Sequence, residues 1–438
     1  MTVMHISDLH FGIPDKTLGG YVEHRQMILD SFLNNLSILP SDLLPDVLVI
    51  TGDIGYSGSE DDYIKAKEFI LEIINRLKGK ITTNDIIICP GNHDVLIPPK
   101  RRRQEARPQK DRLEVEDLEP LTRDNIEASI YKFDNYIKFL KDLNICELEN
   151  RAMASDGDNA IHYLYGYREL KGIQFIVLNS EWDFFGKDDK NAEGCLRLGA
   201  DLVADALDYV NDQEDTIKPV IAIFHRPFIP NIHISERNIY KKKDYNNVDY
   251  LLNANTDMIL NGHVHIGNAS SSYGSRAWSF SCGTLHSIDV ETPEFWLFKF
   301  EGNYYKAIKY KWNFPNARNR KGHWLQDTES DCYEKIWTIG NLNHFETEDQ
   351  HLQFLERLIT DFNNNQISKE EAMNEIQNRF PSLLQSTATR LFDQAILNAS
   401  NKDLEQNKIS INDYQKELTY CDTDNNFENI KEVKEIHE

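Results

Sequence analysis

The chain of 438 residues is long enough for one large domain with an appendage or for two domains. Its 71 acidic and 48 basic residues give a formal net charge of -23, which repels polyanions unless basic groups cluster locally, so long duplex DNA is not the expected partner. No apolar run reaches the roughly 18 residues of a membrane span, and the N-terminus lacks the charged and apolar regions of a signal peptide, so we expect no membrane partner and a cytoplasmic location.

Short apolar runs that are rich in Ile and Val predict buried strands in the first 315 residues. They lie in residues 2–7, 46–53, 85–94, 174–183, 219–227, 257–265 and 277–284. Amphipathic helices are predicted between several of them, for example over residues 61–79, which end on a glycine, and over residues 125–143. This alternation indicates a layered α/β domain.

The composition and periodicity of the chain change towards the C-terminus. In residues 294–313 alternating aromatic residues flank Glu-Gly-Asn, which predicts a hairpin of outer strands. Residues 316–345 are polar and lack clear periodicity, so we expect a linker or an ordered loop. Residues 346–438 have helical periodicity, and Ser368 and Glu371 have capping-box spacing. We therefore expect an α/β domain over residues 1–315 and a small all-α domain over residues 346–438, for homo-oligomerisation or docking of a protein partner.

Five of the apolar runs end in carboxylate, amide or imidazole side chains. These candidate site residues are Asp8, His10, Asp53, Asn92, His93, His225, His263 and His265. In open α/β sheets the carboxyl ends of neighbouring strands meet at one crevice, so we expect these side chains to cluster. The i, i+2 spacing in "DLH" and "HVH" lets both members of each pair point to the same side of an extended backbone.

The chemistry of these side chains suits a divalent metal. Carboxylate oxygen, amide oxygen and imidazole nitrogen are ligands for Mn, Fe and Zn, and the lack of thiolates argues against a structural zinc site. Without His93, these residues make seven candidate ligands, which are too many for one ion. Two ions roughly 3.5–4 Å apart, bridged by a carboxylate, would use all seven and form a clamp for in-line displacement at phosphorus. Burying seven polar groups without an ion would be costly.

The ordered motifs D-x-H, GD, GNHD, a single His after a strand and GHxH resemble those of the calcineurin-like metallophosphoesterase superfamily. The resemblance covers roughly residues 1–300, and every ligand position of the pattern is filled. It implies a four-layer αββα sandwich, which fits the alternation of predicted strands and helices.

The resemblance also implies a ligand partition in which Asp53 bridges two ions. The ligands of the first ion are Asp8, His10 and His265. The further ligands of the second ion are Asn92, His225 and His263. Manganese is the expected metal for both positions, with iron and zinc as alternatives.

Two further residues of the "GNHD" motif are given catalytic roles by the resemblance. His93 is the implied acid that stabilises or protonates the leaving oxygen, and Asp94 would hold its imidazole in register. A metal-bridging hydroxide is the implied nucleophile, because coordination lowers the pKa of water to around 7.

Departures from subfamily patterns narrow the expected substrate. Ser/Thr protein phosphatases of this superfamily carry GDxxDRG and GNHE, whereas this chain has "GDIGYSG" and "GNHD". Purple acid phosphatases have D-x-G where this chain has Asp8 and His10, so Tyr56 need not bind metal. The stretches "ISDLHFG" and "TGDIGYSGSEDDYIKAKEFI" are similar to bacterial cyclic-nucleotide phosphodiesterases. The expected activity is therefore phosphodiester hydrolysis of a nucleotide or short nucleic acid.

Three alternatives stay open. The same metal ligands serve Mre11/SbcD-type nucleases, and the basic stretches 100–112 and 236–244 would suit a nucleic-acid strand, although a solvated surface is their simpler interpretation. A phosphomonoesterase is the second alternative. The third is not enzymatic: a nucleotide-sensing or assembly component that acts through its helical tail.

Overall fold

The computed structural model describes residues 1–14, 22–96, 126, 129–150, 159–184, 196–211, 218–227, 242–271, 277–285, 292–301, 304–314, 322–327 and 334–336, with short pieces between 357 and 375. The chain divides into two compact units, one of residues 1–269 and 276–339 and one of residues 270–275 and 340–438. All the candidate site residues belong to the first unit, so the fold is described for that unit.

The first sheet has the strand order β12-β11-β10-β1-β2-β3, and β13 also pairs with β11. Its strands are β1 (Thr2–Ile6), β2 (Val47–Thr51), β3 (Ile86–Cys89), β10 (Glu294–Glu301), β11 (Tyr304–Asn313), β12 (His323–Gln326) and β13 (Glu334–Ile336). The three N-terminal strands are parallel, whereas β10 is antiparallel to β1. The carboxyl ends of β1, β2 and β3 therefore share one edge.

The second sheet has the order β4-β5-β6-β7-β9-β8. Its strands are β4 (Gly166–Leu170), β5 (Ile173–Val177), β6 (Val220–Ile223), β7 (Met258–Asn261), β8 (Asn268–Ser271) and β9 (Trp278–Ser281). The run from β5 through β6 and β7 to β9 is parallel, and β4 is antiparallel to β5. The central strands of this sheet also end at a common edge.

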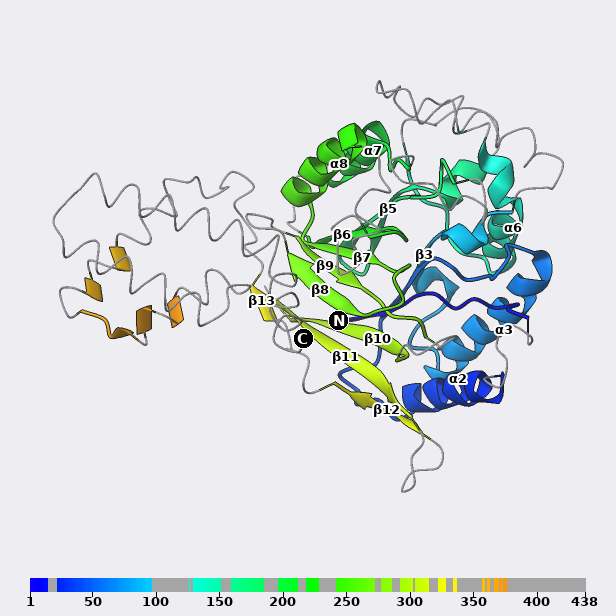
Figure 1. Cartoon of the computed structure of the whole chain (residues 1–438), viewed down its shortest axis with the longest axis horizontal. Coiled ribbons are helices and arrows are strands. Elements are labelled where there is room, and N and C mark those ends of the chain that lie inside the picture. The colour runs from blue at the N-terminus through cyan, green and yellow to red at the C-terminus, as the bar shows by residue number, and fades with distance from the viewer. Residues whose placement is uncertain are drawn as a thin grey trace, which may run out of the picture. The chain divides into compact units, whose positions relative to one another are not determined.

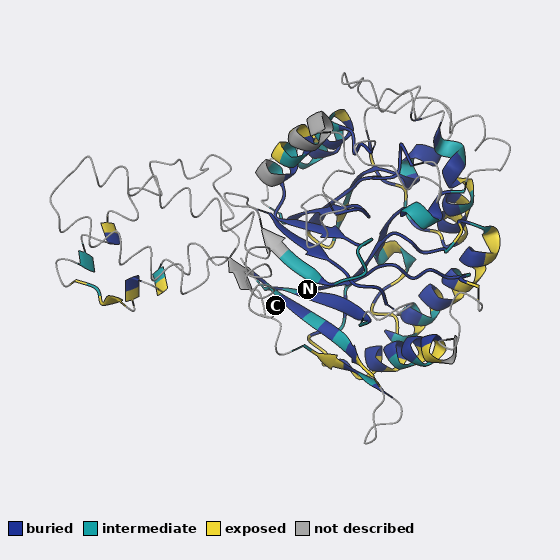
Figure 2. Cartoon of the chain, in the orientation of Figure 1, coloured by how far each residue is buried: buried dark blue, intermediate teal, exposed yellow. Residues whose placement is uncertain are grey.

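Both faces of each sheet are covered, which explains the continuous apolar runs in the sequence. Along β2, Val47 and Val49 point into the core between the two sheets, while Leu48 and Ile50 point into the core beneath the helices. In the second sheet, Phe175 faces the core between the sheets and Ile176 faces the helical side. The central strands β1, β2, β3, β5, β6, β7 and β9 are buried along their whole length, whereas parts of β12 and β4 are exposed (Figure 2).

Helices cover the outer faces of the two sheets (Figure 1). The described helices are α2 (Val22–Leu36), α3 (Glu60–Arg76), α6 (Asp134–Asp142), α7 (Ala200–Asn211) and α8 (Lys242–Asn255). Helices α2 and α3 lie against the first sheet, and α7 packs on β4 and β5 of the second sheet. The predicted four-layer αββα sandwich is confirmed, as are the strands expected from the seven apolar runs. None of the helices among the described residues is long and apolar enough to cross a membrane.

The predicted aromatic hairpin is present, but it does not form the edge of the sheet. β10 and β11 pair antiparallel with Glu301 opposite Tyr304, and β10 lies inside the sheet against β1. β12 and β13 both pair with β11, and they come from the segment 316–345 expected as a linker or an ordered loop. These strands have four and three residues, too short for a clear alternating pattern.

Most of the predicted helical domain, residues 346–438, lies outside the described residues. Within it, the backbone N–H of Ser368 donates to Glu371, and the N–H of Glu371 donates to the Ser368 hydroxyl. This reciprocal pair is the predicted capping box. The domain boundaries stay predictions.

Candidate metal centre

The candidate residues follow strand ends that the sheet register aligns. Ile6 pairs with Ile50 and Thr51 pairs with Cys89, so the segments after β1, β2 and β3 leave the first sheet side by side. In the second sheet Ile223 pairs with Leu260, which aligns the segments after β6 and β7. The clustering expected from the topology is therefore present in the structure.

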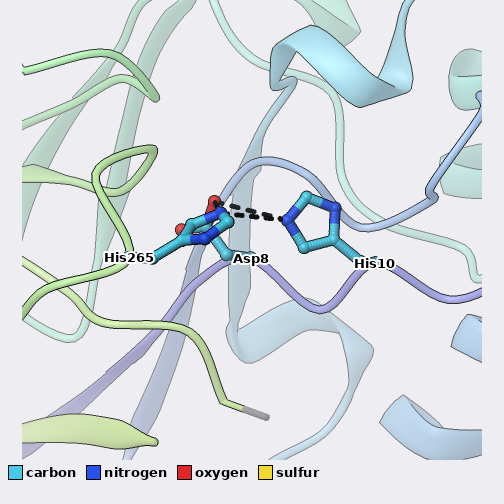
Figure 3. Close-up of side chains that lie close together, drawn as sticks. All are labelled: Asp8, His10 and His265. Atoms are coloured by element: carbon cyan, nitrogen blue, oxygen red, sulfur yellow. Dashed lines mark hydrogen bonds and ion pairs between the residues drawn. The ribbon is translucent and has the colours of Figure 1, made fainter. Parts of the chain in front are cut away.

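The first group of side chains consists of Asp8, His10 and His265. Figure 3 shows them pointing toward one another, with His265 reaching across from the segment after β7. The Nε2 atoms of His10 and His265 are 3.2 Å apart, and the Asp8 Oδ1 atom lies 3.3 Å from His265 Nε2 and 3.8 Å from His10 Nε2. Three ligand atoms therefore face one small volume that could hold an ion.

The second group consists of Asp53, His225 and His263, with Asn92 beside it. His225 Nε2 lies 3.4 Å from Asp53 Oδ2 and 3.2 Å from Asn92 Oδ1. The Nδ1 atom of His225 donates to the carbonyl oxygen of Thr51 at 2.7 Å, which fixes the ring with Nε2 toward the group. This outer hydrogen bond is the kind that orients a metal-binding imidazole.

One carboxylate joins the two groups. The Oδ2 atom of Asp53 is 3.8 Å from His10 Nε2 on one side and 3.4 Å from His225 Nε2 on the other. Its second oxygen accepts the backbone N–H of His93 at 2.7 Å, which holds the carboxylate in place. Asp53 thus has the position that a bridging ligand requires.

The backbone that orients these side chains adopts left-handed conformations, which the sequence pattern did not predict. Positive φ angles of 45° to 71° occur at Asp8, His10, Asp53, His263 and His265. Such angles are uncommon for residues other than glycine, and they cluster at functional sites. The extended backbone expected for "DLH" and "HVH" was therefore wrong: sharp turns bring the paired side chains to the site.

Glycines in the motifs allow the two sheets to approach each other closely. A Cβ atom at Gly52, whose φ is 82°, would lie 2.6 Å from Nδ1 of His225. A Cβ at Gly262 would collide with the hydroxyl of Ser7. The glycine that precedes Asp53 and the glycine that precedes His263 are thus required by packing across the site.

The two buried carboxylates are held ionised by the surrounding imidazoles. Burial alone would raise the pKa of Asp8, but His265 and His225 lower it to about 2. Burial also opposes ionisation of Asp53, yet His225, His93 and His10 keep its pKa well below the usual value. The site is therefore an anionic cluster inside the protein.

The two histidines that flank Asp53 differ in protonation. Burial lowers the pKa of His10 to about 3, which outweighs the effect of Asp53 and leaves a neutral ring that can act as a ligand. Burial also disfavours a charge on His225, but Asp53 outweighs it and raises the pKa of His225 to about 9. An ion bound in the second group would have to displace that proton.

Divalent cations fit this set of donors. The side chains of Asp8 and Asp53 are 0 % and 2 % exposed, and buried charges of this kind require nearby compensating charge. The donors are carboxylate and amide oxygens and imidazole nitrogens, a combination that suits Mn, Fe or Zn. Two groups that Asp53 links, as a member of the second and 3.8 Å from His10 of the first, match a pair of ions better than a single ion.

His93 lies beside the first group and forms a third group of possible ligands with His10 and Asp53. Its ring centroid is 4.6 Å from that of His10, and its Nδ1 donates to the carbonyl oxygen of Tyr56 at 2.6 Å. This hydrogen bond leaves Nε2 as the nitrogen able to exchange a proton with a substrate.

The role expected for Asp94 was wrong. Its carboxylate does not support the His93 ring; it accepts the backbone N–H groups of Ile54, Gly55 and Gly91 at 2.9–3.2 Å. It also accepts the Tyr63 hydroxyl at 3.0 Å. Burial, followed by the nearby Asp53 charge, raises the pKa of Asp94 to about 7. Asp94 therefore ties together the loops after β2 and β3.

Arg226 and Arg25, which the sequence did not place at the site, contact it, and Glu181 pairs with Arg226. Arg226 Nη1 donates to His263 Nε2 at 3.1 Å, and Arg226 is paired with the buried Glu181. Arg25 donates to the carbonyl oxygens of Leu9 and His10, so it supports the "DLH" turn. The sequence did contain a signal for two of these residues. Arg226 directly follows His225, and Glu181 follows β5 at the same sheet edge, so both could have been placed near the site.

The basic stretches lie largely beyond what the structure describes. Residues 100–112 and 236–241 are outside the described residues, and of residues 242–244 only the α8 backbone is described.

A two-sheet sandwich with a buried cluster of carboxylates and imidazoles at its strand ends defines a metal-dependent hydrolase. The model of the calcineurin-like phosphoesterase family matches residues 1–267, and the chain belongs to this family. It is accordingly a hydrolase acting on phosphoesters, from a family that depends on two metal ions.

Solved structures resemble the chain at low sequence identity. A dimetal phosphatase from Danio rerio is 12% identical, with 74% of this chain and 98% of that chain covered and a TM-score of 0.41. Phosphopantetheinyl hydrolase from Mycobacterium tuberculosis is 14% identical, with 65% and 90% covered and a TM-score of 0.34. A putative 5'-nucleotidase from Staphylococcus aureus is 12% identical, with 80% and 57% covered and a TM-score of 0.33. No curated protein sequence matches the chain.

Proposed function

We propose that the protein is a dinuclear-metal-dependent phosphodiesterase that hydrolyses a phosphoester bond of a nucleotide or a short nucleic acid, with manganese as the metal. The observation that carries the proposal is the pair of ligand groups joined by Asp53, whose Oδ2 atom faces His10 on one side and His225 on the other. Iron and zinc are the alternative metals for the same donors.

The side chains divide the work between binding and proton transfer. Asp8, His10 and His265 would hold one ion, Asn92, His225 and His263 the other, and Asp53 would bridge them. When bound, two such ions supply Lewis acidity and lower the pKa of water to around 7.

His93 would stabilise or protonate the leaving oxygen through Nε2, because its Nδ1 is engaged by the Tyr56 carbonyl. The hydrogen bond from the backbone N–H of His93 to Asp53 holds this residue beside the centre. Asp94 acts through the loops that carry these residues.

Motif similarity favours a diester over a monoester as the substrate. The stretches "ISDLHFG" and "TGDIGYSGSEDDYIKAKEFI" are similar to those of bacterial cyclic-nucleotide phosphodiesterases. A nuclease of the Mre11/SbcD type and a phosphomonoesterase use the same ligands and remain the alternatives.

A substrate panel tests the proposal. Purified protein with Mn²⁺ is assayed on bis-p-nitrophenyl phosphate, p-nitrophenyl phosphate, cyclic mononucleotides and dinucleotides, and single- and double-stranded DNA and RNA. We expect diesters of nucleotides to be hydrolysed fastest and Asp53→Ala and His93→Ala to be inactive or strongly impaired. Faster cleavage of long strands would favour the nuclease. If no substrate reacts, or the variants match the wild type, the catalytic proposal is wrong and nucleotide sensing becomes the better hypothesis.

The helical tail is a separate proposal. We propose that residues 346–438 mediate oligomerisation or binding of a protein partner, as their helical periodicity and capping box suggest. Truncation near residue 340 and measurement of mass in solution test this, since an unchanged oligomer would exclude the tail as the assembly element. A cytoplasmic location also stays a prediction.

A further inference from the structure

Arg226 is a buried arginine that faces the candidate metal centre. It follows His225 at the end of β6 and is 6 % exposed. Its Nε donates to both carboxylate oxygens of Glu181, at 2.9 and 3.1 Å, and Glu181 is fully buried. Glu181 engages Nε of the guanidinium, and a terminal nitrogen, Nη1, points to His263.

The guanidinium is fixed from several directions. Its central carbon lies 5.0 Å from the ring centroid of Phe184. The backbone N–H of Arg226 donates to the Ser180 hydroxyl at 3.2 Å, and that hydroxyl donates to Glu181 at 2.9 Å. An arginine held in this way loses little conformational entropy when it binds a ligand.

The segment that carries Glu181 is itself anchored by a buried lysine. Nζ of Lys132 donates to the carbonyl oxygens of Glu181, Trp182 and Phe184 at 3.3, 2.6 and 3.0 Å. Lys132 has no exposed surface. The arrangement fixes the segment whose carboxylate, Glu181, pairs with Arg226.

The contact with His263 shows how near Arg226 lies to the chemistry. A guanidinium has donors and no acceptor, so Arg226 Nη1 donates to His263 Nε2 across 3.1 Å. A phosphoryl oxygen held at the group of Asp53, His225 and His263 would come within reach of the same donors. Arginine is well suited to this task, because its fork of N–H groups matches the oxygens of a phosphate.

We propose that Arg226 is a phosphoryl-binding residue of this site and that Glu181 is its positioning residue. The proposal rests on the proposed phosphoesterase function and extends it to a residue outside the metal ligands. Since Glu181 balances the charge of Arg226, the arginine contributes directed hydrogen bonds more than net charge, which suits the single negative charge of a phosphodiester.

The test measures binding of inorganic phosphate to the Mn²⁺-loaded full-length protein by calorimetry, in the wild type and in Arg226→Gln and Arg226→Lys. Mn²⁺ binding is measured separately for each protein. We expect Arg226→Gln to weaken phosphate binding about ten- to hundred-fold, the range for hydrogen bonds to charged groups, with Mn²⁺ affinity within about two-fold of the wild type. Arg226→Lys, which keeps the charge without the fork, should be intermediate. On a diester substrate the loss should be in KM more than in kcat.

Arg197→Gln is the matched control. Arg197 is also a buried arginine and pairs with Asp183, two residues from Glu181, through hydrogen bonds of 2.6 and 2.9 Å. It should cost stability without changing phosphate affinity. The proposal is overturned if Arg226→Gln binds phosphate like the wild type, if it loses Mn²⁺ in parallel, or if Arg197→Gln shows the same phosphate defect.

Phosphate binding also separates this proposal from the proposed function. A wild-type protein that hydrolyses no diester but binds phosphate through Arg226 would contradict the phosphodiesterase and leave the role of Arg226 intact. If the Arg226→Gln variant hydrolyses diesters as efficiently as the wild type, the phosphodiesterase proposal stands and the proposed role of Arg226 is wrong.

Discussion

The two sheet edges that meet at the site contribute different chemistry. The first-sheet edge, after β1, β2 and β3, supplies both carboxylates, the amide and one imidazole: Asp8, Asp53, Asn92 and His10. The second-sheet edge, after β6 and β7, supplies three imidazoles: His225, His263 and His265. Negative charge to hold cations comes from the first edge alone, and the groups of Asp8, His10 and His265 and of Asp53, His225 and His263 each need at least one histidine from the second edge. A third group, His10, Asp53 and His93, comes wholly from the first edge.

The edges are joined by contacts that do not involve a metal. His225 Nδ1 donates to the Thr51 carbonyl oxygen, and the backbone N–H of His263 donates to Asp8 at 3.1 Å. The apolar core between the sheets brings these groups together. The packing of the two sheets therefore holds the site residues together without a metal. We expect the geometry of the site to persist when metal is removed by a chelator.

Loss of the residue common to both groups should have the largest effect. Asp53→Ala removes the bridging carboxylate, and we expect phosphodiester hydrolysis to fall to background, at least about 10⁵-fold, with weaker binding of both ions. Hydrolysis of bis-p-nitrophenyl phosphate and a Mn²⁺ titration measure this. Asp53→Asn keeps the shape and removes the charge, so it is the matched variant. If either variant loses one ion only, Asp53 is not shared.

His93 lies beside the first group but is expected to act on the substrate. We expect His93→Ala to lower kcat about 10²–10⁴-fold, the range for general acid catalysis, while two Mn²⁺ ions remain bound. Single-turnover kinetics and metal analysis of the same sample distinguish the two effects. A variant that comes out empty of metal would make His93 a ligand instead of an acid.

Single ligand changes can separate the two ligand groups, each of which draws on both edges. Asn92→Ala should weaken the second ion and His265→Ala the first, each by about 100-fold or more, because loss of an outer partner of a ligand already costs roughly 10–100-fold. A Mn²⁺ titration should then show one tight and one weak ion in each variant. Weakening of both ions in both variants would mean that the groups are coupled more strongly than their separate contacts indicate.

The sequence predicted best those features that depend on the residues of a single short segment. Runs of Ile and Val predicted the strands, and the position of Asp8, Asp53 and Asn92 after them predicted one cluster, because parallel strands end at a shared edge. These are consequences of local pattern and sheet topology.

Features that depend on distant partners could not be predicted. Glu181 and Arg226 are 45 positions apart, and neither has a local pattern that identifies the other. The left-handed backbone at Asp8 and His10 is imposed by packing against Gly52 and Asp53, whose carbonyl oxygens accept their N–H groups. Such contacts exist only after the sheets have formed.

Asp94 gives the smallest expected effect on catalysis and the sharpest test of the corrected role. Asp94→Asn should lower the free energy of unfolding by about 1–3 kcal/mol, because it replaces one of the two oxygens that accept the buried N–H groups of Ile54, Gly55 and Gly91 with a donor. Tyr63→Phe, which removes one hydroxyl from the same carboxylate, should cost about 1 kcal/mol. Urea midpoints of the metal-free proteins measure both. If Asp94→Asn instead lowers kcat as much as His93→Ala and leaves the urea midpoint unchanged, the carboxylate serves the imidazole after all, and the loops after β2 and β3 are held by their apolar packing.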